Sequence, residues 1–123
     1  IPLRLVGSEM CIRDSLTATA TIASTCTSGA GATISMGQGS SAGSGSTAAA
    51  PVRRMIGLDG NFLSYAVYSD SGYSAVWGGT DATDVAVTGT GSAVSSTAYG
   101  KLTAGQAAAV TSFADSVVVT LTY

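Results

Sequence analysis

Apolar and polar residues alternate along several short stretches of the chain, which is the pattern of β-strands that bury one face. The first stretch, residues 16–26, has Leu16, Ile22 and small apolar residues on one face and mostly threonine on the other. Residues 32–36 alternate in the same way after a Ser-Gly-Ala-Gly turn. Together these two stretches predict a β-hairpin.

Further stretches carry strand patterns, and turns rich in glycine and serine separate them. Residues 37–50 show no periodicity and predict a flexible surface loop, and the Ala-rich residues 103–112 also predict a loop because Thr and Gly interrupt them. Short strands at this spacing, without a sustained helix, predict an all-β antiparallel sandwich. The additional strands are expected at residues 52–57, 62–69, 75–77, 84–88, 93–102 and 113–123.

The composition favours an extracellular β-domain or the subunit of a surface polymer. Ala, Ser, Thr and Gly make up 70 of the 123 residues. Only 10% of the residues are charged, against about 25% in ordinary globular domains. The formal net charge of -2 predicts no nucleic-acid partner. No stretch approaches the roughly 18 uninterrupted apolar residues of a membrane span, so we expect none.

The domain is predicted to begin at Leu16, where the composition changes. Residues 1–15 hold four of the twelve charges, whereas residues 16–123 hold eight. Residues 6–15 also resemble translated sequencing-adapter sequence, so we assign 1–15 to a foreign leader. A genuine N-terminal strand is the alternative, because Leu3 and Leu5 alternate with other residues. The leader lacks the order of a signal peptide, so the native start of the chain is predicted to be missing.

The chain has two cysteines, Cys11 and Cys26. Two cysteines in a secreted β-domain usually form one disulfide. If Cys11 belongs to the foreign leader, Cys26 has lost its proper partner, so we predict no bridge between the two. The alternative is a pair of buried free thiols in a cytosolic protein.

No residue pattern predicts catalysis, a cofactor or a metal site. The chain has no histidine and Lys101 has no Ser-x-x-Lys spacing, so a nucleophile would lack an activating base. Residues 43–48 match G-x-G-x-x-A but lack the strand, the helix and the acidic residue of a dinucleotide site. Asp81 and Asp84 lack calcium-loop spacing and predict solvated carboxylates. We therefore predict a protein that is not an enzyme and has no cofactor and no metal.

Two aromatic residues and two arginines are further candidates for contact with a ligand or with solvent. Tyr73 and Trp77 are candidates for stacking on a sugar, although an aromatic side chain that covers the end of a sandwich is commoner. They carry our alternative function, a carbohydrate-binding or tip-adhesin module. Arg53 and Arg54 occupy opposite faces of one predicted strand, so one is expected to pack its stem and the other to meet solvent.

The C-terminal stretch 113–123 is the strongest functional candidate. It is long for a strand, and only 28 of the 108 residues after Ser15 are large and apolar, so the core is thin. A long strand at a sheet edge exposes unpaired backbone groups, which natural proteins seldom leave uncovered. A strand added from another chain would pair with these groups and fill the core, which is β-augmentation.

Short motifs follow one another along most of the chain. They are TCTSG at 25–29, RRM at 53–55, LSYAVYSD at 63–70, VWG at 76–78, VTGTG at 87–91, YGKL at 99–102, AGQ at 104–106 and FADSVVVTLTY at 113–123. No single motif is specific, but the ordered set resembles the spore coat protein U domain family across residues 16–123.

That family is similar to the subunits of archaic chaperone-usher pili, whose immunoglobulin-like sandwiches lack one strand. The resemblance implies that a periplasmic chaperone lends the missing strand first and the N-terminal extension of the next subunit lends it afterwards, with an outer-membrane usher as a further partner. The groove for this strand would be lined by Val117, Val119 and Leu121, or by the opposite phase around Val118. The expected interface residues are Phe113, Val117, Val119, Leu121 and Tyr123.

The resemblance thus implies a secreted structural subunit of a pilus or a surface (spore) coat. Such a subunit would reach the cell surface via the periplasm and support adhesion or biofilm formation. Family members carry an earlier strand whose cysteine would be the disulfide partner of Cys26. We expect this chain to be a fragment without that strand, the donor extension and the signal peptide.

Overall fold

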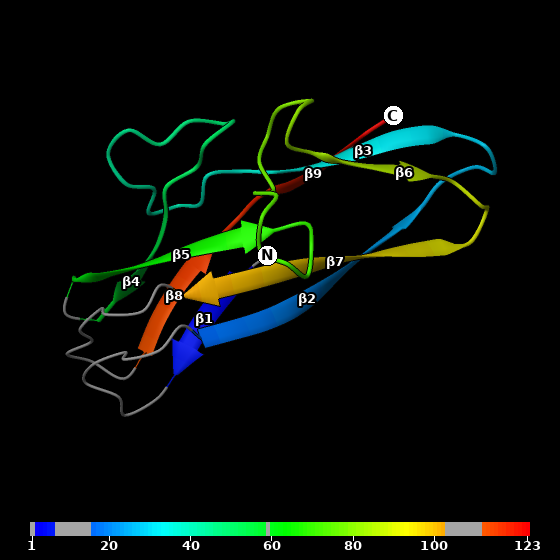
Figure 1. Ribbon diagram of the computed structural model, residues 1–123. Coiled ribbons are helices and arrows are strands. Elements are labelled where there is room, and N and C mark those ends of the chain that lie inside the picture. The colour runs from blue at the N-terminus through cyan, green and yellow to red at the C-terminus, as the bar shows by residue number, and fades with distance from the viewer. Residues whose placement is uncertain (1, 7–15, 59, 103–111) are drawn as a thin grey trace.

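The computed structural model describes residues 2–6, 16–58, 60–102 and 112–123. Within these ranges the chain forms antiparallel strands and no helix, which confirms the predicted all-β class (Figure 1). No described helix is therefore long and apolar enough to cross a membrane. The strands are β1 (Pro2–Val6), β2 (Leu16–Thr25), β3 (Gly31–Met36), β4 (Arg53–Gly57), β5 (Phe62–Tyr68), β6 (Val85–Thr88), β7 (Ala93–Leu102), β8 (Ser112–Ser116) and β9 (Val119–Thr122).

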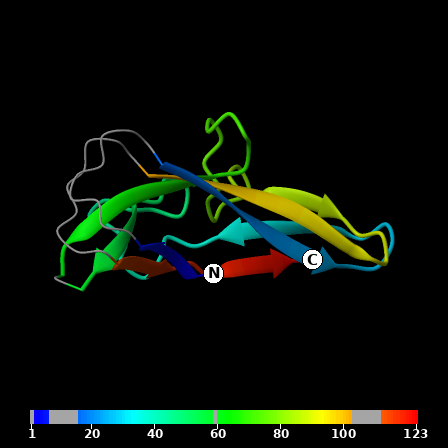
Figure 2. The same ribbon diagram turned by 90° about the horizontal axis from the view of Figure 1, so that it is seen from below.

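The strands are arranged in two sheets around one hydrophobic core. The larger sheet has the order β1-β8-β4-β5-β7-β2 and the smaller one has the order β6-β3-β9. Figure 2 shows β3 and β9 on one side of the molecule and β7 on the other. Strand β5 illustrates why the sequence folds this way, because every second residue is buried. The core consists of Ile34, Met36, Met55, Leu63, Tyr65, Val67, Trp77, Ala98, Leu102, Phe113 and Val117.

The predicted hairpin between residues 16–26 and 32–36 is wrong. Strand β2 pairs along its whole length with β7, from Leu16 opposite Leu102 to Thr25 opposite Ala93. Strand β3 pairs with β6 and β9 in the other sheet. The turn between β2 and β3 carries the chain from one sheet to the other. Alternation along a strand specifies which face is buried but not which strand lies beside it, and here the long-range partners form the ladders.

The predicted single strand at 113–123 is divided between the two sheets. Strand β8 lies between β1 and β4 in the larger sheet, whereas β9 lies at an edge of the smaller sheet. The chain crosses between the sheets at residues 117–118. The Val118 carbonyl accepts a hydrogen bond from the Gly37 N–H at 2.8 Å, so the loop after β3 holds the crossing in place.

The structure also bears on the strand expected at 75–77, the leader segment and the loop expected at 103–112. Residues 75–77 contribute only an isolated bridge, with Val76 opposite Tyr68. The leader segment contains the strand β1, as the alternative interpretation of an N-terminal strand predicts, while its foreign origin stays a prediction. The loop expected at 103–112 lies outside the described residues except at its last position.

Candidate strand-accepting edge

The C-terminal segment pairs with its own chain along one side. At the start of this side, Ala114 of β8 lies opposite Ile56 of β4. In the middle, the Ser40 N–H donates to the Ser116 carbonyl at 3.0 Å. At the end, β9 pairs with β3, from Val119 opposite Met36 onward. This side of the segment is therefore closed by β4, the loop after β3 and β3 itself.

Within the part of the chain that the structure describes, the other side has a neighbouring strand only at β8. Strand β1 runs antiparallel to β8 there, from Pro2 opposite Ser116 to Val6 opposite Ser112. The pairing with β1 ends at Ser116, three residues before β9 begins. Among the described strands, β9 has β3 as its one neighbour, so its second side is an edge of the sheet. We call this side of Val119–Thr122 the open edge.

The structure decides which phase of the segment faces the interior. Phe113 and Val117 are 2% and 3% exposed, whereas Val118 is 72% exposed. Val119 and Leu121 continue the inward phase and are half-buried. The odd-numbered residues therefore face the core, and the opposite phase around Val118 faces solvent. The last of the five expected interface residues differs from the other four, since Tyr123 is 93% exposed.

Several apolar side chains are only partly buried, although they pack against the fully buried core. They come from β9 at the open edge, from β6 at the opposite edge of the smaller sheet and from β2 of the larger sheet. An apolar side chain that stays half in water leaves part of its burial free energy unrealised. The residues concerned are Ala20, Ile22, Val85, Val87, Val119 and Leu121.

A buried arginine supports the C-terminal segment from β4. Arg53 is 1% exposed, and its guanidinium donates to the carbonyls of Gly37 at 2.8 Å and Trp77 at 2.6 Å. Its burial lowers the pKa of the Arg53 guanidinium, while Tyr65 and Asp115 act in the opposite direction. Arg54 is half-buried on the other face, so the prediction of opposite faces is confirmed. The structure goes further than the predicted packing of one stem, because the whole Arg53 side chain is buried and Arg54 also donates to the carbonyls of Ser41 and Ala42.

Asp115 ties β8 to the loop after β3 and to β5. Asp115 is 4% exposed, and its carboxylate accepts hydrogen bonds from Ser40 N–H at 3.0 Å and Ser40 Oγ at 2.8 Å. The Tyr65 hydroxyl donates to the second carboxylate oxygen at 2.5 Å. Burial, followed by this hydrogen bond, raises the pKa of Tyr65 well above its usual value. Sequence reasoning missed Asp115 as a site residue, although a carboxylate in the apolar phase between Phe113 and Val117 is a signal of a buried polar partner.

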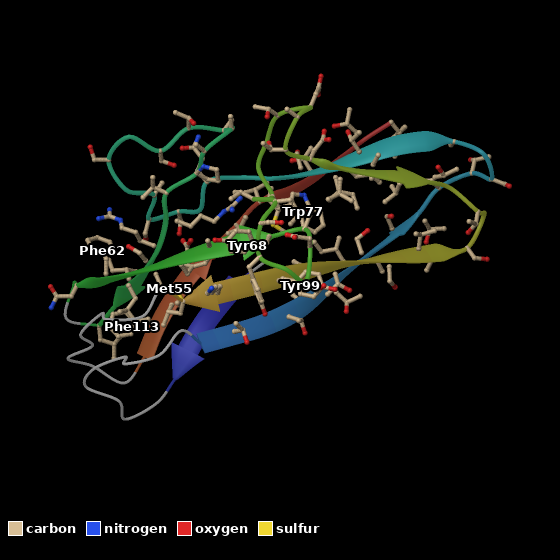
Figure 3. All side chains as sticks on the ribbon, in the orientation of Figure 1. Met55, Phe62, Tyr68, Trp77, Tyr99 and Phe113 are labelled. Carbon is tan, nitrogen blue, oxygen red and sulfur yellow. The ribbon has the colours of Figure 1, made fainter. Side chains whose placement is uncertain are left out.

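The two candidate ligand residues are in different environments. Trp77 is fully buried and its indole N–H donates to the Ile34 carbonyl at 2.8 Å (Figure 3). The contact with a ligand proposed for Trp77 is incompatible with this position, because core packing encloses the whole ring. Tyr73 is half-exposed and lies with Tyr68 and Tyr99 outside the core. Only Tyr73 therefore stays a candidate for ligand contact.

The remaining candidates of the sequence analysis are scattered. Cys26 is partly buried and is a free thiol in the described part of the chain. Cys11 lies outside the described residues, so the absence of a Cys11–Cys26 bridge and the loss of the family partner of Cys26 both stay predictions. Asp81 is exposed and Asp84 is half-exposed, in the segment before β6. Within the described ranges no three His, Cys, Asp or Glu residues gather into a metal-binding group.

Comparisons with known proteins agree with this architecture. The sequence profile described as Spore Coat Protein U domain matches residues 7–120, which includes part of the segment assigned to the leader. No curated protein matches the chain. A solved chain from the CsuC-CsuE chaperone-tip adhesion subunit pre-assembly complex of archaic chaperone-usher Csu pili of Acinetobacter baumannii is similar, with a TM-score of 0.60 and 14% identity. The similarity covers 100% of this chain and 40% of that chain, so our chain spans less than half of its neighbour and shares its fold. The predicted pilin-like fold class is confirmed.

Proposed function

Because the chain belongs to the Spore Coat Protein U domain family, we propose that it is a structural, non-enzymatic subunit of a pilus-type surface fibre that accepts a β-strand from a partner at the open edge. The observation that carries the proposal is the open edge itself, where β9 has one described neighbour and the adjacent apolar side chains are half-buried. The fold shared with a chain of a chaperone-usher complex supports the same class of function.

Two physical terms favour an added strand at this position. The first is backbone pairing, since an uncovered edge offers N–H and C=O groups to any strand that fits. The second is burial, because a strand with apolar residues at alternate positions would remove Val119 and Leu121, the half-buried residues of β9, from water. A partner strand should therefore carry alternating apolar and polar residues.

The proposed partners follow from this requirement. A periplasmic chaperone would lend a strand during export, and a neighbouring subunit would lend one in the fibre, with an outer-membrane usher between the two stages. The chain would then reach the cell surface via the periplasm. Adhesion or biofilm formation would be a property of the assembled fibre.

The test is to add synthetic strand peptides to the full chain and to follow thermal unfolding by circular dichroism. A peptide of alternating Val and Thr at 100 times its dissociation constant should stabilise the chain by about 2.7 kcal/mol. This corresponds to a rise in melting temperature of about 10 °C for a domain of this size. A peptide of the same composition in a non-alternating order is the control, and the proposal fails if neither or both raise the melting temperature equally.

Two adjacent valines provide a matched pair of variants for the same assay. Val119 faces inward beside the open edge, whereas Val118 is 72% exposed on the opposite face. Val119→Thr should weaken binding of the alternating peptide about tenfold because it places a hydroxyl in the new interface. Val118→Thr should leave binding within about twofold, since its side chain stays in solvent. Equal losses in both variants would show that the peptide binds elsewhere.

A further inference from the structure

Three tyrosines from separate elements meet on the outer face of the larger sheet. Tyr68 of β5 lies opposite Tyr99 of β7, so their side chains share one face (Figure 3). Tyr73, from the turn after β5, is edge-to-face with both, with ring centroids 5.7 Å from Tyr68 and 6.4 Å from Tyr99. All three are partly exposed, and none belongs to the buried core. We call Tyr68, Tyr73, Tyr99 and the nearby Lys101 the tyrosine face.

The turn after β5 holds Tyr73 in an uncommon backbone conformation. Tyr73 has a φ of 55°, the one positive φ of a described non-glycine residue. Such a conformation costs about 1 kcal/mol or more, and it often occurs where a side chain must be presented to a ligand. The Asp70 carboxylate stabilises the turn by accepting hydrogen bonds from the N–H groups of Ser74 at 3.0 Å and Ala75 at 2.9 Å. These bonds also lower the pKa of Asp70, after the larger effect of the Ser74 hydroxyl.

A cation completes the tyrosine face. The Lys101 ammonium lies 5.4 Å from the centre of the Tyr73 ring. No described carboxylate forms an ion pair with Lys101, and Asp70, the acidic residue of the adjacent turn, directs its oxygens to Ser74 and Ala75. Lys101 therefore offers a positive charge to a ligand that contacts the rings. On β2, Thr17 and Thr19 lie opposite Lys101 and Tyr99 and add exposed hydroxyls to the same face.

A second pair of a cation and an aromatic ring lies further along this face. The Arg54 guanidinium sits over the Phe62 ring, 3.8 Å from its centre. Arg54 lies opposite Ser64 and Lys101 lies opposite Ala66, on the two strands that flank β5. From the ordinary strand spacing and rise, the Cα atoms of the two cations are about 12 Å apart. The exposed or half-exposed carboxylates of Asp70, Asp81 and Asp84 lie in turns and loops outside the strands of this face. Among the described residues, the strands thus carry cations and no carboxylate on this outer face, in a chain whose net charge is -2.

We propose that the tyrosine face binds an acidic polysaccharide. Aromatic rings pack against the C–H faces of sugar rings, and the tyrosine and threonine hydroxyls hydrogen-bond to sugar hydroxyls. Lys101 pairs with a carboxylate of the polymer. Arg54, whose guanidinium also donates to the carbonyls of Ser41 at 3.0 Å and Ala42 at 3.2 Å, contacts a second acidic sugar further along the chain through its positive charge. The match of charge selects an anionic polymer over a neutral one, and the spacing of the two cations selects a polymer over a single sugar. This activity goes beyond fibre assembly and does not depend on the open edge.

The test uses the full chain and defined oligosaccharides in isothermal titration calorimetry. The probes are an alginate octasaccharide, in which every sugar carries a carboxylate, and a neutral maltooctaose of the same length. The alginate probe should bind, its affinity should fall as salt is raised, and maltooctaose should bind at least tenfold more weakly. Chemical shifts of residues 68–73 and 99–101 in the 15N-labelled chain should change on titration with alginate. Absence of alginate binding, or equal binding of both probes, overturns the proposal.

Variants separate the roles of charge and ring. Lys101→Gln should weaken alginate binding about tenfold and reduce its salt dependence by about half, because Arg54 keeps the second ionic contact. Tyr99→Leu should weaken the binding of both oligosaccharides, because it removes an aromatic ring but no charge. Tyr123→Leu is the matched aromatic control, since Tyr123 is 93% exposed at the far end of the chain and should have no effect. If Tyr123→Leu reduces binding as much as Tyr99→Leu, or if the shift changes fall outside the tyrosine face, the proposal is wrong.

Discussion

Replacing Asp115 should reveal how much the C-terminal segment depends on its buried polar contacts. The carboxylate accepts hydrogen bonds from Ser40 N–H, Ser40 Oγ, Ser41 N–H and the Tyr65 hydroxyl, at 3.0, 2.8, 3.3 and 2.5 Å. Asp115→Ala removes all four acceptor contacts at once. It also removes the negative charge that favours the charged form of the buried Arg53.

The magnitude follows from which donors lose their acceptor. A hydrogen bond to a charged group contributes about 1.5 to 3 kcal/mol, and the contributions of one network do not simply add. The Tyr65 hydroxyl is buried, so it suffers the full cost, whereas water can reach Ser40 at the surface of the loop. With the uncompensated charge of Arg53, Asp115→Ala should lower the free energy of unfolding by about 4 kcal/mol. Asp115→Asn keeps one acceptor oxygen for Ser40 and should cost about 2 kcal/mol.

Urea unfolding of the full chain measures these effects, and the fluorescence of Trp77 reports them, because it is the one tryptophan of the chain and is fully buried. Asp81→Asn is the control, since Asp81 is exposed and its replacement should change the free energy of unfolding by less than about 0.5 kcal/mol. A loss below about 1 kcal/mol for Asp115→Ala would refute the reasoning. So would an equal loss for the Ala and Asn variants, because the difference between them rests on the retained oxygen.

Three further predictions concern residues around the same core. Gly39 and Gly45 both have positive φ, but of these two only Gly39 would place an added Cβ against the Asp115 carboxylate. Gly39→Ala should therefore destabilise the chain by about 2 kcal/mol more than Gly45→Ala in urea unfolding. Equal losses would mean that the loop moves to make room for the Cβ and would contradict this prediction. The pKa of Tyr65 is raised in the folded state, so above pH 10 the unfolded chain loses the hydroxyl proton and the folded chain keeps it. The stabilisation from this hydroxyl is therefore complete below pH 10, and the free energy of unfolding falls above pH 10 by about 1.4 kcal/mol per pH unit. Tyr65→Phe should remove that slope in unfolding measured between pH 9 and 11, and an unchanged slope would contradict the assignment. Trp77→Phe should cost about 2 to 3 kcal/mol by circular dichroism, since it loses both volume and the hydrogen bond to Ile34, and a loss below about 0.5 kcal/mol would contradict this account.

Local patterns in the sequence predicted the strands well because each stretch itself shows the alternation of apolar and polar residues that a half-buried strand requires. Strands β3, β5 and β7 lie within one or two residues of the predicted ranges. The partner of each strand is a different kind of information. A turn signal toward β3 follows strand β2, but β2 pairs with β7, which lies 86 residues away at the first rung, Leu16 opposite Leu102. Nothing in the alternation of β2 distinguishes these two partners.

The buried charges show a second limit of sequence reasoning. Arg53 and Asp115 occupy apolar phases of their strands, and a charge in such a position demands partners. The partners of Arg53 are largely backbone carbonyls of Gly37 and Trp77, which no side-chain pattern announces. They come from a loop that the sequence predicts to be flexible and from a residue that it offers as a ligand contact. The polar cluster could be suspected from two misplaced charges, but its composition required the fold.

In the C-terminal segment, neither the neighbouring strands nor the partners of a buried charge could be predicted from the sequence. The proposal that the open edge accepts a strand therefore needed the structure. The sequence left open which phase faces inward, because both phases of 113–123 contain valines. Asp115 resolves the choice, since its contacts with Ser40 and Tyr65 fix the odd-numbered residues of β8 toward the core, and Val119 and Leu121 continue that phase into β9. The residue that looks least suited to an apolar groove thus determines which side chains border the open edge. A variant that loosens Asp115 should therefore weaken strand acceptance as well as stability, even though Asp115 would not touch the incoming strand.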